Sequence, residues 1–310
     1  MNKAVSSLEV LQSVSDAITE MVSRATPSVV TVSNGMGRGS GVVWSSDGYV
    51  VTCSHVVGRR GKVTVGLADG KKYEARVVGQ DPYSDVALLK VEGSGFEPIG
   101  LGDSEKTRVG EFVLAVANAF YRQPSATSGI VTSVGGSLRR WGVTSVDNVI
   151  VTDAQLNPGY SGGPLLNVSG KMIGLNMAYV WSRGIAVPIS TVKHVVDSLK
   201  SEGKVKRAYL GILADTISLP DEIATREEVG QDGGVLVHQV EAGSAARKAG
   251  LALGDIVIKF NGKPVTNIYD LHAVLTDEVA GKETKIAILR GEKLIELKVT
   301  PSTAPDNVKE

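Results

Sequence analysis

A serine in a glycine-dense turn is the feature of this sequence that most clearly indicates a reactive group. The segment 157–164, NPGYSGGP, places Ser161 between two apolar runs. Glycines let the main chain turn its N–H groups inward, and preorganised N–H donors stabilise the oxyanion of an acyl-transfer intermediate. The candidate donors are the N–H groups of Gly159 and Ser161. Most glycine-rich strings are merely tight turns, so this motif indicates catalysis only if it has partners.

A base and a carboxylate that could activate this serine lie upstream. A serine hydroxyl is a weak nucleophile near neutral pH unless an imidazole takes its proton, and a carboxylate must hold that imidazole in the correct tautomer. His55 lies in the apolar segment 50–57, VVTCSHVV, and Asp85 directly precedes another apolar run. The chain order His, Asp, Ser is that of chymotrypsin-like enzymes. We therefore predict a triad with Ser161 as nucleophile, His55 as general base and Asp85 as its orienter.

Short strands are expected to position these residues. The chain contains 36 glycines and only 5% aromatic residues, and valine dominates its apolar runs, which favours short strands joined by tight turns. Two successive sets of strands are predicted, 29–32, 41–44, 49–52, 62–67, 72–78 and 86–91, then 112–117, 127–134, 149–152, 165–166, 172–177 and 184–187. Two barrels would result, with His55 and Asp85 from the first meeting Ser161 from the second.

Helices and a second unit flank these strands. Ser6 and Glu9 have capping-box spacing, and apolar residues recur at helical intervals up to Pro27. This amphipathic helix is expected to pack either on its own β unit or against another subunit. A second helix is predicted over 190–200. Beyond a polar break, strands near 209–212, 234–240 and 254–265, a helix over 267–278 and a hairpin around 290–291 are predicted.

The segments that contain His55, Asp85 and Ser161 resemble those of the HtrA, or DegP-like, serine protease family. The segments 101–104 (LGDS), 127–131 (TSGIV) and 184–188 (GIAVP) share the resemblance, which spans roughly residues 25–302. The resemblance implies a mainly β fold, in which two six-stranded β-barrels of chymotrypsin-like architecture and an N-terminal helix precede a C-terminal α+β PDZ domain. The implied boundaries are 1–26 for the helix, 27–200 for the protease domain, 201–206 for a linker, 207–302 for the PDZ domain and 303–310 for a tail.

The resemblance also implies a peptide-binding loop. Tyr209, Leu210, Gly211 and Ile212 match the family's loop that holds a peptide's terminal carboxylate with backbone amides, while the peptide adds to the sheet as an edge strand. A packing domain that binds nothing is the alternative.

Pocket residues follow from the same resemblance. The residue six before the nucleophile lies at the base of the primary pocket in chymotrypsin-like enzymes, and here it is Gln155, followed by Leu156. Met177 and Tyr179 occupy further pocket positions. Because no carboxylate is among them, desolvation disfavours a substrate cation, and cleavage after apolar residues is expected.

Other ligands are not expected. Acidic and basic residues number 33 each, so no net field attracts nucleic acid. His194, His238 and His272 lack metal-ligand spacing, so neither a metal nor another cofactor is predicted. The glycine run 35–41 is not followed by a phosphate-loop lysine motif. Cys53 could be proposed as a thiol nucleophile, but two positions from His55 on the same segment it cannot easily attack across the site.

The expected function is ATP-independent serine endopeptidase activity against unfolded or damaged proteins, with peptide C-termini as PDZ ligands and a homo-oligomer, a trimer by family resemblance, as the assembly. The alternative is a chaperone-like binding protein for misfolded clients with a latent or inert protease site. Charged residues interrupt the N-terminal segment, and no stretch is long enough to span a bilayer. With a lone cysteine, this predicts a cytoplasmic protein.

Overall fold

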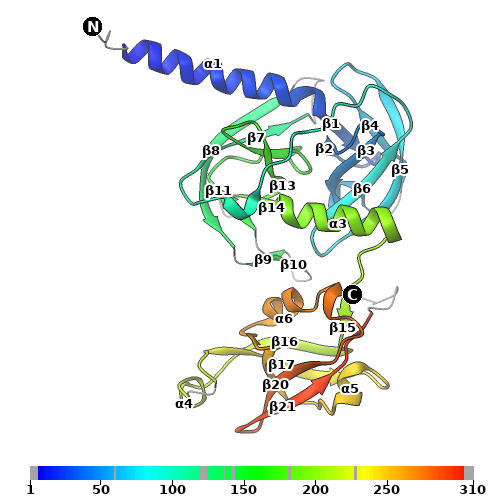
Figure 1. The fold of residues 1–310 in the computed structure, drawn as a ribbon, viewed down its shortest axis with the longest axis vertical. Coiled ribbons are helices and arrows are strands. Elements are labelled where there is room, and N and C mark those ends of the chain that lie inside the picture. The colour runs from blue at the N-terminus through cyan, green and yellow to red at the C-terminus, as the bar shows by residue number, and fades with distance from the viewer. Residues whose placement is uncertain are drawn as a thin grey trace. The chain divides into compact units, whose positions relative to one another are not determined.

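The computed structural model describes residues 6–58, 61–118, 124–135, 137–140, 144–147, 149–180, 183–226 and 229–303. For 137–140, 144–147, 178–180, Tyr269 and Ala273 it describes the backbone alone. The chain divides into two compact units, Met1–Val205 and Lys206–Glu310. Figure 1 shows a mainly β first unit with two long helices and a second unit in which one sheet is joined by short helices.

The first six strands close into an antiparallel barrel in the order β1-β2-β3-β6-β5-β4. They are β1 (Val29–Ser33), β2 (Arg38–Val43), β3 (Tyr49–Cys53), β4 (Val63–Gly66), β5 (Lys72–Asp81) and β6 (Val86–Val91). Valine and leucine side chains fill the interior, because β-branched and aliphatic residues suit a pleated, buried surface. Gly48 and Gly70 take φ values of +90° and +89° in the turns before β3 and β5, which explains glycine at both positions.

The second barrel has the order β11-β14-β13-β12-β7-β8. Its strands are β7 (Phe112–Ala117), β8 (Ser125–Val134), β11 (Ile150–Thr152), β12 (Pro164–Asn167), β13 (Met172–Val180) and β14 (Arg183–Pro188). A separate hairpin of β9 (Ser137–Arg140) and β10 (Thr144–Asp147) lies between β8 and β11 in the sequence and was not predicted. Both predicted barrels are confirmed, with strand ends that differ by a few residues.

Two long helices accompany the barrels. The helix α1 (Ser7–Ala25) begins with the predicted capping box, in which the Ser6 N–H donates to Glu9 Oε2 at 2.7 Å and the Glu9 N–H donates to Ser6 Oγ at 3.2 Å. The helix α3 (Ile189–Glu202) ends at Gly203, which has a φ of +73°. It packs against β5 and β6 of one barrel and β13 and β14 of the other (Figure 1).

The amphipathic face of α1 is only partly covered. Ile18, Met21 and Val22 pack on the core of the first unit. Leu8 and Leu11, about two to four turns nearer the N-terminus, are exposed over 79% and 67% of their surface. The helix therefore packs on its own domain with its C-terminal half and leaves an apolar stripe uncovered on its N-terminal half.

The second unit is built on a sheet with the strand order β16-β17-β18-β20-β21. These strands are β16 (Ile212–Ser218), β17 (Gly233–Val240), β18 (Ile256–Phe260), β20 (Thr284–Arg290) and β21 (Lys293–Val299). The short strand β19 (Lys263–Pro264) pairs with β18, and β15 (Ala208–Tyr209) pairs with β22 (Ser302–Thr303). The helices are α4 (Asp221–Ala224), α5 (Ala245–Ala249) and α6 (Ile268–Val274). The strand β16 is an edge of its sheet.

Three details of the second unit differ from the sequence expectation. The predicted helix over 267–278 ends at Val274 and is followed by a separate 3₁₀ turn over Asp277–Val279. The helix α5 was missed, because five residues after the cap Ser244 are too few to establish a helical period. The strand predicted to open at 209–212 begins at Ile212, since Leu210 and Gly211 form a loop between β15 and β16.

Candidate active site

His55 and Asp85 come from adjacent strands of the first barrel. His55 is the second residue of α2 (Ser54–Val57), a single turn that directly follows β3. Asp85 directly precedes β6, which pairs with β3, so the two residues lie at the same end of neighbouring strands. The Ser54 N–H donates to the Asp85 carbonyl at 2.9 Å and fixes this end of the ladder.

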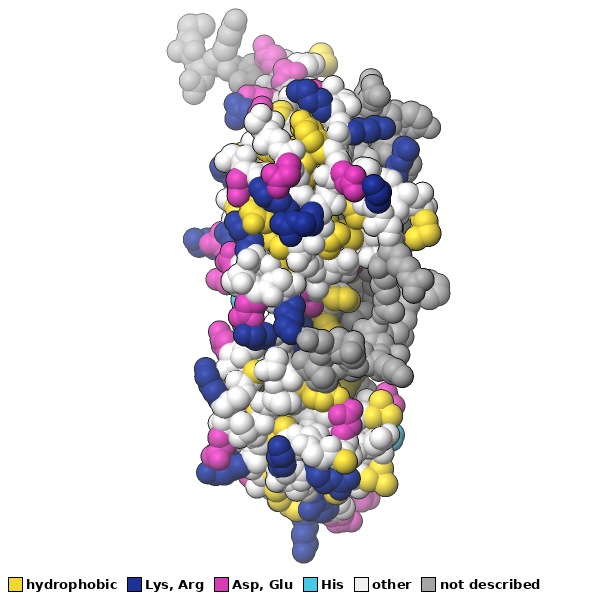
Figure 2. All heavy atoms as spheres, turned by 90° about the vertical axis from the view of Figure 1, so that its right-hand side faces the viewer, with side chains coloured by type: hydrophobic (Ala, Val, Ile, Leu, Met, Phe, Trp, Pro, Cys, Tyr) yellow, Lys and Arg dark blue, Asp and Glu magenta, His cyan; other side chains and the backbone are white. Residues whose placement is uncertain are grey.

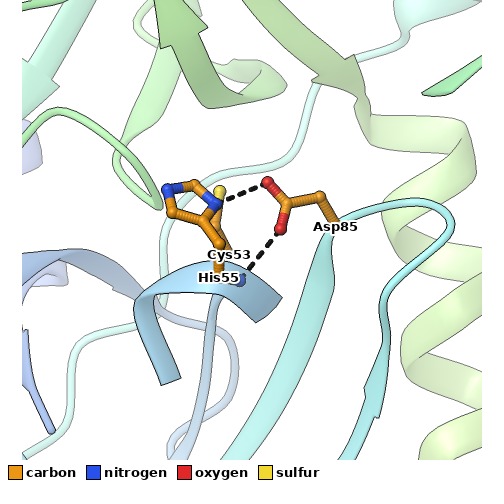
Figure 3. A group of neighbouring side chains, drawn as sticks. All are labelled: Cys53, His55 and Asp85. Carbon is orange, nitrogen blue, oxygen red and sulfur yellow. Dashed lines mark hydrogen bonds and ion pairs between the residues drawn. The ribbon is translucent and has the colours of Figure 1, made fainter. Parts of the chain in front are cut away.

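The Asp85 carboxylate holds the imidazole at two points. Its Oδ2 lies 2.6 Å from His55 Nδ1, and its Oδ1 accepts the His55 backbone N–H at 2.9 Å (Figure 3). The Asp85 side chain is 4% exposed and the His55 side chain is 30% exposed. A buried carboxylate facing Nδ1 favours the tautomer with its proton on Nδ1, which makes Nε2 the nitrogen that carries the lone pair and can accept a proton.

The backbone of Asp85 explains how the carboxylate reaches this position. Its φ is +57°, a left-handed conformation that aspartate tolerates better than most non-glycine residues. The preceding turn is fixed by Asp81, whose Oδ2 accepts the Ser84 hydroxyl at 2.6 Å and the Ser84 N–H at 3.2 Å. Asp85 is thus held between an ordered turn and β6.

Ser161 lies in a tight turn that only glycine can complete. The Tyr160 N–H donates to the Asn157 carbonyl at 3.0 Å, and the chain then turns through Gly162, which has a φ of +87°. A Cβ at Gly162 would lie 2.1 Å from the Ser40 carbonyl oxygen and 2.4 Å from Thr52 Oγ1. Both the conformation and the space therefore exclude a side chain beside the nucleophile.

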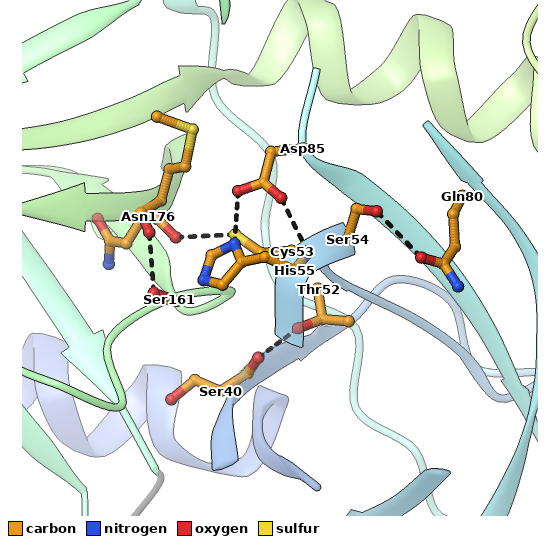
Figure 4. A network of polar contacts seen from close by, with 10 residues as sticks. Ser40, Thr52, Cys53, Ser54, His55, Gln80, Asp85, Ser161 and Asn176 are labelled. Carbon is orange, nitrogen blue, oxygen red and sulfur yellow. Dashed lines mark hydrogen bonds and ion pairs between the residues drawn. The ribbon is translucent and has the colours of Figure 1, made fainter. Parts of the chain in front are cut away.

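This turn is bonded to both barrels. The Ser40 N–H donates to the Ser161 carbonyl and the Ser40 hydroxyl to the Gly159 carbonyl, both at 2.8 Å. From the other side, the Asn176 carbonyl accepts the Gly162 N–H at 2.7 Å and Cys53 Sγ at 3.3 Å (Figure 4). One oxygen thereby joins the residue after Ser161 to the residue two before His55. The structure thus brings Ser161 to the His55–Asp85 pair.

The Ser161 hydroxyl donates to the Met177 carbonyl of β13 at 2.8 Å (Figure 4). In this resting arrangement the nucleophile's proton is held by a backbone acceptor. Rotation about one side-chain bond, χ1 of Ser161, changes which acceptor the hydroxyl faces.

The two predicted oxyanion donors are available. Within the described ranges, neither the Gly159 N–H nor the Ser161 N–H has a hydrogen-bond acceptor. Gly159 adopts a φ of +101°, and its carbonyl accepts the Ser40 hydroxyl. The turn is therefore fixed without a hydrogen bond from either of these two N–H groups to another described residue. Unpaired backbone donors beside a serine hydroxyl suit a developing negative charge.

The predicted pocket residues do not share one environment. Gln155 is exposed, and its carbonyl accepts the Thr127 hydroxyl at 2.8 Å. Leu156 and Met177 are buried, in the cores of the second barrel and of the larger cluster respectively. The backbone of Tyr179 belongs to β13, whereas its side chain lies outside the described part of the structure.

Tyr160 anchors the nucleophile turn in the second barrel. Its ring is buried among Leu156, Leu165 and other apolar side chains. Burial raises the pKa of the Tyr160 hydroxyl, and a hydrogen bond with Thr127 offsets part of that effect. Packing on one side of Ser161 therefore complements the hydrogen bonds on the other.

Sequence reasoning missed the residues that support the triad. Ser40 and Asn176 are buried and join the turn to the two barrels, but a serine or an asparagine within a strand carries no recognisable signal. The fully buried Cys53 places Sγ within 4.8 Å of the His55 and Asp85 ligand atoms. The position of Cys53 two residues before His55 was the sequence signal that could have predicted this contact.

The predicted peptide-binding loop lies at the edge of the second unit's sheet. Among the described residues, the N–H groups of Leu210 and Gly211 have no acceptor, whereas the Leu210 carbonyl accepts the Ala246 N–H at 2.9 Å. The Tyr209 hydroxyl donates to Glu241 Oε1 at 2.7 Å, and Ile212 begins the edge strand β16. A Cβ at Gly211 would lie 2.3 Å from Ser244 Cβ, so this loop also requires glycine.

The face shown in Figure 2 has no large patch of a single charge. Lysine and arginine side chains are interspersed there with aspartate and glutamate, in keeping with the 33 basic and 33 acidic residues of the sequence. In the part of the chain that the structure describes, no helix is both long and apolar enough to span a bilayer.

Comparison with known proteins agrees with this geometry. The family described as "Trypsin-like peptidase domain" matches residues 39–175, and the family described as "PDZ domain" matches residues 211–300. The protein is 37% identical over 274 residues to a "Probable periplasmic serine endoprotease DegP-like" of Chlamydia trachomatis, and 37% identical over 276 residues to the "Periplasmic pH-dependent serine endoprotease DegQ" of Escherichia coli. Each match covers 86% of this chain, and 54% and 60% respectively of the relative, so the chain spans little more than half their length.

A solved structure titled "HtrA-type protease AlgW with tripeptide" has a TM-score of 0.79 at 29% identity, and the match covers 94% of this chain and 99% of that one. The fold and the matched domains thus define a chymotrypsin-like serine peptidase domain followed by a PDZ domain. The chain belongs to the HtrA/DegP-like family of serine proteases.

The expectation of a cytoplasmic location is wrong, because these relatives are named periplasmic proteins. The interrupted N-terminal segment and the lone cysteine, on which it was based, do not discriminate between compartments. A secretory leader is removed from the mature chain. A protein with a single cysteine forms no internal disulfide in either a reducing or an oxidising environment.

Proposed function

We propose that this protein is an ATP-independent serine endopeptidase that cleaves unfolded or damaged polypeptides. The observation that carries the proposal is the buried Asp85 carboxylate 2.6 Å from His55 Nδ1, together with the Gly159 and Ser161 N–H groups, which have no acceptor among the residues that the structure describes. On the naming of its relatives we place this activity in the periplasm.

The reaction begins with release of the Ser161 hydroxyl from the Met177 carbonyl. A substrate backbone that pairs with 175–178 of β13 offers that carbonyl an N–H donor, and the hydroxyl then turns to His55 Nε2. His55 takes the proton as Ser161 attacks the scissile carbonyl, and Asp85 stabilises the imidazolium. The N–H groups of Gly159 and Ser161 bind the oxyanion. His55 returns the proton to the leaving amine, and a water molecule hydrolyses the acyl-enzyme by the same steps.

Cleavage of unfolded casein by Ser161→Ala and Ser169→Ala variants tests this assignment. Ser169 is an exposed serine in the turn between β12 and β13, so its replacement is a matched control for loss of a hydroxyl. We expect Ser161→Ala to lose all measurable cleavage while Ser169→Ala keeps it. Cleavage by Ser161→Ala at the rate of the control would remove Ser161 as the nucleophile.

The pocket is proposed to accept apolar side chains. Leu156 and Met177 are apolar and buried, Gln155 is uncharged, and none of the three could compensate a substrate lysine or arginine. Tyr179 remains part of this proposal by family resemblance. Mass spectrometry of casein fragments should show cleavage after aliphatic residues, and predominant cleavage after lysine or arginine would contradict the pocket assignment.

The PDZ unit is proposed to bind peptide C-termini. The N–H groups of Leu210 and Gly211, which have no acceptor within the described part of the chain, suit a terminal carboxylate. The edge of β16, unpaired in the same described residues, can accept an added strand, with Tyr209 and Ile212 bordering the loop. Bound peptides are named in the titles of the similar AlgW structures. An apolar-ended peptide should bind, and its C-terminally amidated form should bind at least about tenfold more weakly, since hydrogen bonds to a charged group contribute about 1.5–3 kcal/mol.

A homo-oligomer, a trimer by family resemblance, is the proposed assembly. The uncovered apolar stripe of α1, including Leu8 and Leu11, supports an association surface of this kind. Light scattering after size exclusion should give a multiple of the 32.5 kDa chain mass, and a monomer at all concentrations would contradict it.

The ordered His55–Asp85 pair disfavours the alternative of a binding protein with an inert site.

A further inference from the structure

Three side chains with different metal-binding atoms, those of Cys53, His55 and Asp85, meet at the catalytic imidazole. Cys53 Sγ, a His55 ring nitrogen and an Asp85 carboxylate oxygen all lie within 4.8 Å of one another. The residues come from the end of β3, from α2 and from the residue before β6 (Figure 3). The expectation of no metal rested on the spacing of the other three histidines along the chain, which cannot reveal a cluster that joins Cys53 to a residue 32 positions away.

The chemistry of this cluster is selective. Thiolate, imidazole and carboxylate together suit Zn²⁺ and similar divalent transition metals, whereas Mg²⁺ and Ca²⁺ prefer oxygen ligands alone. Cys53 is fully buried and the Asp85 side chain is 4% exposed, so two ligands lie in a low-dielectric environment. The His55 side chain is 30% exposed and provides the route of entry.

We propose that Cys53, His55 and Asp85 form a binding site for a thiolate-preferring divalent cation such as Zn²⁺, and that its occupation switches off the catalytic serine. The cation bonds to Cys53 Sγ, His55 Nδ1 and Asp85 Oδ2, and a water molecule completes four-coordination. Tetrahedral bonds of about 2.0–2.2 Å to nitrogen and oxygen place those two atoms about 3.4 Å apart. In the metal-free site they are 2.6 Å apart, so the pair must separate by about 0.8 Å and its hydrogen bond is lost.

Metal binding also changes the proton inventory. The thiol loses its proton to solvent, and the imidazole proton moves from Nδ1 to Nε2 because Nδ1 must donate its lone pair to the cation. With a proton on Nε2, His55 cannot accept one from Ser161. The Asn176 carbonyl keeps the Gly162 N–H as a donor at 2.7 Å when the thiol proton leaves, so the Ser161 turn retains that anchor.

Cobalt absorption on the Ser161→Ala protein tests binding without reference to activity. Because Cys53 is the single cysteine of the sequence, a thiolate-to-cobalt charge-transfer band reports on this residue alone. We expect the band to appear on titration with Co²⁺, to saturate at one equivalent and to disappear on addition of Zn²⁺. Absence of the band in the folded protein would overturn the proposal, without dependence on a cysteine variant that could fail to fold.

Zinc inhibition of casein cleavage tests the consequence, which rests on the proposed peptidase function. Each protein is compared with its own chelator-treated rate, so Cys53→Ala and Cys53→Ser need only a measurable activity. Loss of the sulfur ligand should raise the zinc concentration for half-inhibition at least about tenfold, since loss of even an outer partner of a metal ligand costs about 10–100-fold in affinity. Equal inhibition of all three proteins would overturn the inhibitory role. A protein that shows the cobalt band but cleaves nothing keeps the metal site and fails the proposed function.

Discussion

Replacement of Asp85 by asparagine is the most informative change to the triad. The Asp85 Oδ1 accepts the His55 backbone N–H at 2.9 Å, so the amide oxygen of asparagine takes that position. The amide NH₂ group must then face His55 Nδ1, where Oδ2 lay 2.6 Å away. A donor at that point requires Nδ1 to accept, which moves the imidazole proton to Nε2, the atom that must receive the proton of Ser161.

The expected loss in kcat is about four orders of magnitude, by analogy with the same change in the worked serine-protease triad. At 1.36 kcal/mol per tenfold change, this corresponds to about 5 kcal/mol of transition-state stabilisation. Initial rates on an apolar peptide substrate measure it, with circular dichroism to check the fold. Asp69→Asn, an exposed aspartate in the turn before β5, is the matched control and should retain the parent rate. An Asp85→Asn enzyme with more than about a tenth of the parent kcat would refute the tautomer argument.

Three further predictions concern the turns and the buried tyrosine. Gly162→Ala should lower the free energy of unfolding by roughly 3 kcal/mol, because the φ of Gly162 is +87° and the new Cβ would lie 2.1 Å from a carbonyl oxygen. The control Gly170→Ala, at a glycine with a φ of +68° and no atom nearer than 4.0 Å to the new Cβ, should lower it by only about 1 kcal/mol. Urea titrations measure both free energies, and equal losses would contradict the steric argument. Burial raises the pKa of Tyr160, so its contribution to stability is complete below the pKa of an unfolded tyrosine, about 10, and is lost as pH rises beyond it. Tyr160→Phe should therefore lose less of its neutral-pH stability in alkaline solution than the parent, and parallel losses would count against the burial argument. Gly211→Ala should weaken peptide binding at least about tenfold in fluorescence anisotropy, since its φ is +74° and its Cβ would contact another at 2.3 Å; Gly243→Ala has the same φ and open space, and an equal effect of both would point to backbone strain alone.

The sequence predicted the architecture well because local signals and global fold agree. Valine-rich apolar runs and the Ser6–Glu9 capping box each specify one local structure, and both are realised, in the two barrels and in α1. The end of α6 and the helix α5 were not predictable, since a few residues cannot establish a period and tertiary packing decides where a short helix stops.

The candidate site was only partly accessible from sequence. The types and order of His55, Asp85 and Ser161 indicate nucleophilic catalysis by a serine, because few other roles require that combination. The supporting hydrogen bonds of Ser40 and Asn176 are not visible in the sequence, since they join segments more than 100 residues apart through a side-chain hydroxyl and a backbone carbonyl. The resting contact between Ser161 and the Met177 carbonyl depends on a side-chain rotamer, which no sequence pattern specifies.

Mass mapping of the protein after reaction with a fluorophosphonate probe tests the central claim most directly. A serine activated by His55 and Asp85, with the Gly159 and Ser161 N–H groups beside it, should carry the single adduct on the peptide that contains Ser161. Prior denaturation should abolish the reaction, since the three side chains then separate. An adduct on another serine of the folded protein, or equal labelling of folded and denatured protein, would contradict the account.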